Sequence, residues 1–103
     1  MEYEDEQAAT RFRLETERKE LLQKQLDEDF REIMATRGGR RFIWHAMAEC
    51  LVFQPVYHAE ASVMYLREGK RQIGLNYLMK IQSLCPSQYQ VMANENATNP
   101  IEE

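Results

Sequence analysis

Two histidines, His45 and His58, are the residues of this sequence best suited to acid–base or metal chemistry. They are thirteen positions apart, no HExxH pair is present, and neither lies at metal-ligand spacing from a cysteine. His58 with Glu60 would make only a weak ligand pair. The sequence also contains neither a GxGxxG motif nor a P-loop. We therefore expect both histidines to be structural, and we expect no enzyme activity, no metal site and no cofactor.

Two basic clusters offer a different chemistry, the binding of anions. If the helices pack antiparallel, both clusters could lie at one end of a bundle and hold carboxylates or phosphates. Three interpretations remain open: contact with a protein partner, contact with nucleic acid, or capping of helix ends with a soluble surface. The first cluster is Arg37, Arg40 and Arg41, and the second is Arg67, Lys70 and Arg71.

Length and composition limit the remaining possibilities. The 103 residues suffice for one small domain, and an apolar content of 44% permits a core. The net charge of −4 argues against a protein that coats nucleic acid non-specifically. No segment is apolar enough to cross a bilayer, and the acidic start does not resemble a signal peptide. Cys50 and Cys85 are expected to be reduced core thiols, which fits a cytosolic origin.

The first 36 residues contain no glycine or proline and are rich in helix-forming residues. We predict a helix from about residue 7 to 35. Two interpretations of it remain: a solvated charged helix, or an assembly arm that packs on a neighbouring subunit. Its apolar side chains recur at helical spacing and form one stripe, which we interpret as an assembly seam. The stripe consists of Leu22, Leu26, Phe30 and Ile33.

The rest of the chain predicts a small bundle of about four helices. Gly38 and Gly39 are expected to end the first helix, because glycine readily adopts the left-handed conformation of a helix C-cap. Helices are expected over about 40–52, 57–68 and 70–84, with Gly74 permitting a close crossing. The last two would form one continuous helix if Gly69 is tolerated inside it. A short helix should follow Pro86, with Ser87 and Gln90 forming a capping box at its start. The fold class is therefore all-α, with an N-terminal helix at 1–36, a helical domain at 37–95 and a flexible tail at 96–103.

Three segments in order resemble a family of small tailed-phage proteins. They are "GRRFIWHAMAECLVF", "YLREGKRQIGLNYLMKI" and "CPSQYQVMANEN". The family is of podophage type and is typified by an open reading frame from the head–tail gene region of a Bordetella phage. The resemblance covers about residues 36–95 and maps its paired basic motifs onto Gly39 to Arg41 and Arg67 to Arg71. It implies a phage context and a small helical domain, and it supplies no catalytic residues.

Within that phage context, we interpret the chain as a non-enzymatic virion protein that acts by binding other proteins. It would be a minor structural, portal-associated or internal (ejection) component. It would occur in several symmetric copies, contact portal, tail or internal proteins, and reach packaged DNA in some arrangements. Its location would be the virion, and the host cytoplasm before assembly. Two alternatives remain: a small DNA-binding module of helix-turn-helix type, and a non-virion accessory protein made during infection.

Overall fold

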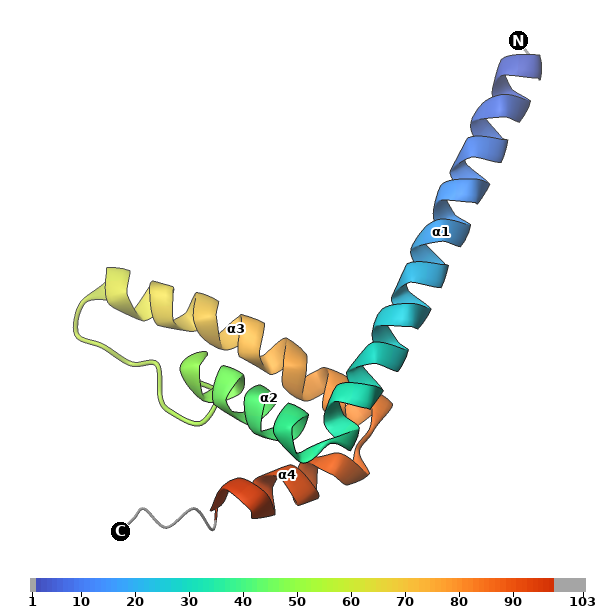
Figure 1. Ribbon diagram of the computed structural model, residues 1–103. Helices are drawn as coiled ribbons and strands as arrows, with labels where there is room; N and C mark the ends of the chain where they lie inside the picture. Colours follow the sequence, from blue (N-terminus) through green and yellow to red (C-terminus); the bar gives the residue numbers. More distant parts are fainter. Residues whose placement is uncertain (1, 98–103) are drawn as a thin grey trace. The chain divides into compact units, whose positions relative to one another are not determined.

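The computed structural model describes residues 2–97, which form four helices and no strand in that range (Figure 1). The helices are α1 (Glu2–Ala35), α2 (Arg37–Glu49), α3 (Ala61–Leu84) and α4 (Ser87–Ala97). The predicted all-α class, with a long N-terminal helix before a helical bundle, is confirmed. None of these helices is long and apolar enough to span a membrane. Of the tail expected at 96–103, the first two residues belong to α4, and 98–103 lie outside the described residues.

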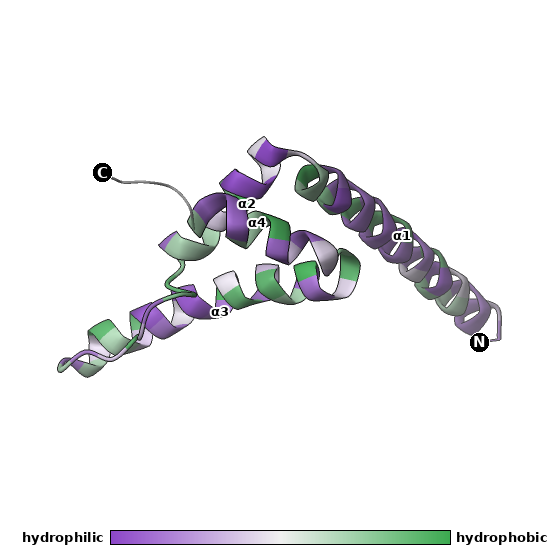
Figure 2. Cartoon of the chain, turned by 90° about the horizontal axis from the view of Figure 1, so that it is seen from below, coloured by the Kyte–Doolittle hydropathy of each residue, from purple (hydrophilic) through white to green (hydrophobic). Residues whose placement is uncertain are grey.

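The chain divides into two compact units, residues 1–30 and 31–103. The first unit consists of α1 up to Phe30, and its charged side chains are almost all exposed. Figure 2 shows this helix as mostly hydrophilic, with separate hydrophobic bands along its length. The second unit contains the last turn of α1 together with α2, α3 and α4. The division between the two units therefore falls inside α1, after Phe30.

The turn from α1 to α2 is made by Thr36, and the prediction that Gly38 and Gly39 end α1 is wrong. Thr36 is extended, with φ −106° and ψ 148°, and its Oγ1 accepts a hydrogen bond from the Gly39 N–H at 3.0 Å. This is the geometry of a helix N-cap. Both glycines lie in the first turn of α2, and neither has a positive φ. Helix α2 therefore begins three residues earlier than predicted.

Gly39 is nevertheless required at this turn, for a steric reason. A Cβ at position 39 would collide with the carbonyl oxygen of Ile33 and lie 2.7 Å from its carbon and 2.8 Å from Thr36 Oγ1. The clash is mainly with backbone, which cannot move aside as a flexible side chain can. At Gly38, by contrast, an added Cβ would have no atom within 4 Å. The two adjacent glycines thus have different roles.

The C-terminus of α2 lies earlier than expected and is made by an unusual residue. The helix ends at Glu49, and Leu51 takes a left-handed conformation with φ 63°. The Val52 N–H donates to the Met47 carbonyl at 3.1 Å, as in a Schellman motif. Glycine usually occupies the left-handed position, so sequence pattern gave no indication of this end and the helix was expected to reach residue 52.

The third helix is continuous, so the two helices expected at 57–68 and 70–84 are a single element. Gly69 lies inside it and does not break it. Within residues 2–97, three helices therefore follow α1, and the continuous alternative to a helix end at Gly69 is the one observed. Gly74 is buried, and a Cβ there would collide with Val52 Cγ2 and lie 2.7 Å from Cys50 Cβ. The predicted close approach at Gly74 is confirmed.

The beginning of α4 differs from the expected capping box. Its first turn is closed by backbone bonds, from the Gln88 N–H to the Cys85 carbonyl and from the Tyr89 N–H to the Pro86 carbonyl. The Gln90 amide, expected to reach back toward the helix start, instead donates to Asn94 Oδ1 at 2.7 Å. Pro86 does separate α3 from α4, as predicted.

The core of the second unit is small and rich in methionine. Each helix supplies one fully buried side chain, and Ile43 of α2 is 5% exposed. Methionine has three rotatable bonds and fills irregular gaps, which suits a bundle whose helices differ in length. The fully buried side chains are Met34, Met47, Ile81 and Met92.

Candidate functional site

The guanidinium of Arg40 hydrogen-bonds to three other residues of the second unit. Its Nε and Nη2 donate to the two carboxylate oxygens of Glu95, both at 2.8 Å, in a bidentate pair. Its Nη1 donates to the Met34 carbonyl at 3.0 Å and lies 3.5 Å from Gln88 Oε1. The Met34 carbonyl is one of the last four of α1, which have no partner within the helix. One side chain thus joins the end of α1 to α2 and α4.

This geometry removes Arg40 from the predicted surface patch. Its side chain is 11% exposed and that of Glu95 is 21% exposed. The expectation that Arg40 points outward to bind a partner is wrong, because its donors are already used inside the chain. Sequence reasoning missed Glu95 as the counter-ion. A usable indication was present, since Glu95 is the only charged residue in the sequence of α4.

Three arginines determine the ionisation of Glu95. The hydrogen bonds from Arg40 are the largest cause that lowers the pKa of this carboxyl, and burial opposes them. The charges of Arg40, Arg37 and Arg41 lower the pKa further. Correspondingly, the pKa of Arg40 is raised, chiefly by its hydrogen bonds to Glu95. The pair therefore remains fully ionised at neutral pH.

The depressed pKa predicts a specific acid sensitivity. A carboxylate with a lowered folded-state pKa stabilises the fold above its unfolded-state pKa, roughly 4.3 for glutamate. That stabilisation is lost as the pH falls through the lower folded-state pKa. We expect the melting temperature (Tm) to fall below about pH 4, and the fall to be shallower in Glu95→Gln. Thermal melts by circular dichroism between neutral and acidic pH would measure this. Equal slopes in the two proteins would contradict the assignment.

The remaining five basic residues do not form one patch. Gly74 of α3 lies against Cys50 and Val52 at the end of α2, and α3 extends beyond that point toward its own N-terminus (Figure 1). The second basic cluster lies on this extension, while the first lies at the start of α2. The expected single end-on patch is therefore replaced by two separate clusters. The clusters are Arg37 with Arg41, and Arg67, Lys70 and Arg71.

The members of these clusters differ in their surroundings. Arg37 is 73% exposed, with its Nε 3.9 Å from the Glu95 carboxylate. Arg41 is also exposed. Arg67 is half-buried and donates from Nη1 to the Tyr57 carbonyl at 3.3 Å, which holds the connection before α3. Lys70 is exposed and Arg71 is half-buried. Arg37, Arg41 and Lys70 are thus the cations most available to an external anion.

Aromatic and histidine side chains near these clusters have structural partners. The ring of Trp44 stacks on Phe53 with centroids 4.5 Å apart, so this indole is half-buried within the chain. Phe42 is 72% exposed. His58 Nδ1 accepts a hydrogen bond from the Glu60 N–H at 3.0 Å, just before α3, which confirms its structural role. Residues 2–97 bring together no cluster of side chains that could hold a metal ion.

The two cysteines are free and half-buried. Burial is the largest influence on Cys85 and raises the pKa of its thiol, while the charge of Arg31 acts in the opposite direction. Arg31 lies close because its Nε donates to the Leu84 carbonyl at 3.3 Å, at the end of α3. The raised pKa favours the protonated form of the Cys85 thiol at neutral pH.

The assembly seam predicted on α1 is mostly exposed. Leu22, Leu26 and Ile33 are 60%, 46% and 43% exposed, whereas Phe30 is 7% exposed. Phe30 therefore belongs to the buried residues of the chain and is unavailable to another molecule. Phe12, nearer the N-terminus, is 72% exposed and extends the seam in that direction.

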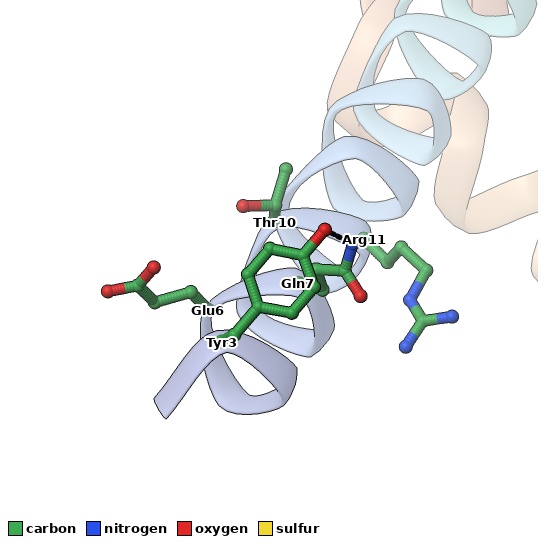
Figure 3. A pocket seen from close by; sticks show the side chains of 5 residues that line it. All are labelled: Tyr3, Glu6, Gln7, Thr10 and Arg11. Carbon is green, nitrogen blue, oxygen red and sulfur yellow. Dashed lines mark hydrogen bonds between the residues drawn. The ribbon is translucent and has the colours of Figure 1, made fainter. Parts of the chain in front are cut away.

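A hollow near the start of α1 does not form a binding site. It is lined by side chains of two successive turns of this one helix (Figure 3). Tyr3 and Gln7 close one side through a hydrogen bond of 2.9 Å from the glutamine amide to the tyrosine hydroxyl. A ligand there would touch a single helix face and remain largely in solvent, whereas small-molecule sites bury most of their ligand.

Comparison with known proteins supports the resemblance found in the sequence. The model of the Bbp19-like phage protein family matches residues 30–94. The match includes the end of α1, all of α2 and α3, and most of α4; Arg40 lies inside it and Glu95 is one residue beyond its end. No curated protein and no solved structure matches the chain. Because the family match covers more than half of the sequence, the chain belongs to the Bbp19-like phage protein family.

Proposed function

We propose that this protein is a non-enzymatic component of a tailed-phage virion that acts by protein–protein binding. It would be a minor structural, portal-associated or internal component, present in several symmetric copies. The family places the chain in a phage context. The observation that carries the proposal is the exposed apolar surface of α1, where Phe12, Leu22 and Leu26 are 72%, 60% and 46% exposed. Large apolar side chains gathered on an exposed helix indicate a contact surface.

The exposed cations offer a second contact. Arg37 and Arg41 stand at the start of α2, where cations oppose the helix dipole and gain nothing from the helix itself. A carboxylate on another virion protein, or a phosphate of packaged DNA, would offset that cost. Because Arg40 is engaged by Glu95 inside the chain, this contact relies on Arg37 and Arg41 alone.

Mass spectrometry of purified phage particles tests the proposal. We expect the protein at a fixed multiple copy number in particles that have been washed in high salt. Absence from particles, with abundance in the infected-cell lysate, would identify a non-virion accessory protein instead. Strong retention on duplex DNA at physiological salt would favour the DNA-binding alternative.

Two variants then test which surface is used. Phe12→Lys with Leu22→Lys changes the arm, and Arg37→Glu with Arg41→Glu changes the exposed cations. Because all four side chains are exposed, we expect each variant to keep its helical circular dichroism and its Tm within a few degrees. Incorporation into particles, measured after complementation of a gene deletion, should fall sharply for the arm variant. Normal incorporation of both variants would contradict binding through either surface.

A further inference from the structure

One face of α1 has a row of six side chains whose positions are symmetric about residue 24. Successive members are four, three, four, three and four residues apart, so the row follows a single side of the helix. All six side chains are exposed. This set, called the 15–33 row below, consists of Glu15, Lys19, Leu22, Leu26, Asp29 and Ile33.

The chemistry of the row is complementary about the same midpoint. Leu22 and Leu26 lie two residues on either side of position 24 and are 60% and 46% exposed. Lys19 and Asp29 lie five residues on either side and have opposite charges. An antiparallel copy of the helix therefore places leucine opposite leucine, and Lys19 opposite Asp29. In a two-fold interface residue i contacts residue j and j contacts i, which is the relation that this spacing produces.

Residues beside the row fit the same antiparallel arrangement. Side chains that flank the seam of a helix pair form ion pairs across it and fix the orientation of the two helices. On one flank these are Arg18, Gln25 and Glu32, which are all exposed. In the antiparallel pair Arg18 faces Glu32 of the second copy, and Gln25 faces its own copy. At the ends of the row Glu15 faces Ile33, so no two like charges are opposite one another.

Most charges that would repel a second copy lie on the other side of α1. Residues 15–33 contain seven acidic and four basic residues, a net charge of −3. Of these eleven, six are turned by about 120° or more from the row, at about 100° per residue. They point away from the partner, where solvent and salt screen their repulsion. These six are Glu17, Glu20, Lys24, Asp27, Glu28 and Arg31.

The charges of the row are available to a second molecule. Within residues 2–97, none of Glu15, Lys19 and Asp29 forms an ion pair inside the chain. The Gln25 amide donates to Asp29 Oδ1 at 2.9 Å, which leaves the other carboxylate oxygen for a lysine. A parallel pairing would instead place each residue opposite its own copy. Three like-charge contacts would then lie at the centre of the interface, and such contacts strongly disfavour association.

We propose that two copies of the chain associate through an antiparallel pairing of the 15–33 row, with Leu22 against Leu26 and Lys19 against Asp29 in both directions. This rests on the proposed function and deepens it, since it names a second copy as the partner of the exposed face of α1. The contact is about 27 Å long at 1.5 Å per residue. Its apolar part is small, so the charged contacts determine both the orientation and the choice of partner.

Charge reversal in the full chain tests the pairing. Lys19→Glu turns both Lys19–Asp29 contacts into like-charge contacts, and Asp29→Lys does the same. In sedimentation equilibrium we expect wild type to self-associate, and the dissociation constant to increase at least about tenfold in each variant, which corresponds to about 1.4 kcal/mol. The variant with both substitutions again has two opposite-charge contacts and should recover the wild-type value. Because both side chains are exposed, all three variants should keep their helical circular dichroism.

Lys24→Glu is the matched control. It changes the net charge as much as Lys19→Glu does, but it lies on the side of α1 that points away from the partner, so the dissociation constant should stay that of wild type. Equal weakening by the two substitutions would mean that net charge alone governs association, and would overturn the proposal. A wild type that remains monomeric would overturn it as well. Copy number in particles is measured separately, so incorporation of a monomeric protein would retain the virion role and reject only this pairing.

The same variants distinguish the two orientations. In a parallel pair, Lys19→Glu would replace one like-charge contact by another and leave the dissociation constant nearly unchanged. Self-association of Lys19→Glu at the wild-type level would therefore overturn the antiparallel pairing, as would a double variant as weak as the single ones. Leu22→Lys with Leu26→Lys removes the apolar centre of the row and should leave the protein monomeric. Persistent self-association of this variant would place the interface elsewhere on the chain.

Discussion

Gly39→Ala is expected to destabilise the protein by about 3 kcal/mol, near the upper end for a single added methyl group. The methyl would collide with the Ile33 carbonyl oxygen, a backbone atom at the end of α1. Relief requires the turn at Thr36 to open, and opening it removes the hydrogen bond from the Gly39 N–H to Thr36 Oγ1. For a domain of this size the loss corresponds to a decrease in Tm of roughly 12–24 °C.

Gly38→Ala is the matched control for this prediction. The substitution adds the same methyl one residue earlier, where no atom lies within 4 Å and φ is not positive. Alanine restricts the unfolded chain more than glycine does, so a gain of about 0.5 kcal/mol is expected. Urea denaturation of both variants, followed by circular dichroism, would measure the difference. Equal stabilities for the two variants would contradict the steric account of the turn.

The sequence predicted the helices well where a single local cause defines them. The uninterrupted run of helix-forming residues up to residue 36 gave an end for α1 within one residue of Ala35. Pro86, which cannot continue a helix, correctly predicted that α3 ends at Leu84. Burial at Gly74 also followed from the sequence, because a glycine among apolar residues of a helix favours a close approach. These features depend on residues adjacent in the chain.

The helix ends that sequence reasoning misplaced depend on tertiary structure. Glycine commonly marks the end of a helix, yet Gly38, Gly39 and Gly69 each lie inside one. The actual break is Thr36, whose cap hydrogen bond can form only when the chain turns there. Leu51 adopts the left-handed conformation that glycine usually supplies. Local propensity is a weak guide at such positions, because packing overrides it.

Among the predicted basic residues, Arg40 has a different role from the one expected, because it pairs with Glu95 inside the chain. Arg40 and Arg41 are adjacent and chemically identical, so sequence alone does not show which one points inward. Once the bounds of α2 are known, helix periodicity distinguishes the two arginines, because residues three or four positions apart lie on the same face. Arg40 shares the inward face of α2 with Ile43 and Met47, whereas Arg41 is exposed. Glu95, 55 residues away in the sequence, then completes the pair.

The internal position of Arg40 leads to the second large expected effect. Arg40→Gln should lower the Tm by roughly 10 °C, because it leaves the Glu95 carboxylate half-buried without its main partner and the Met34 carbonyl without its donor. Arg41→Gln, one residue along and exposed, should change the Tm by no more than a few degrees. Thermal melts of the two variants at neutral pH would measure the contrast. A similar loss in both would mean that total positive charge matters and the pair does not.

A double-mutant cycle shows whether the effect belongs to the pair itself. Glu95→Gln alone should be destabilising, because it leaves the Arg40 guanidinium without a counter-ion. In the Arg40→Gln background the same change should cost much less, since the carboxylate it removes no longer has a partner there. The sum of the two single losses should therefore exceed the loss in the double variant. Additive losses would show that Arg40 acts mainly through the Met34 carbonyl and that Glu95 stabilises the fold by another route.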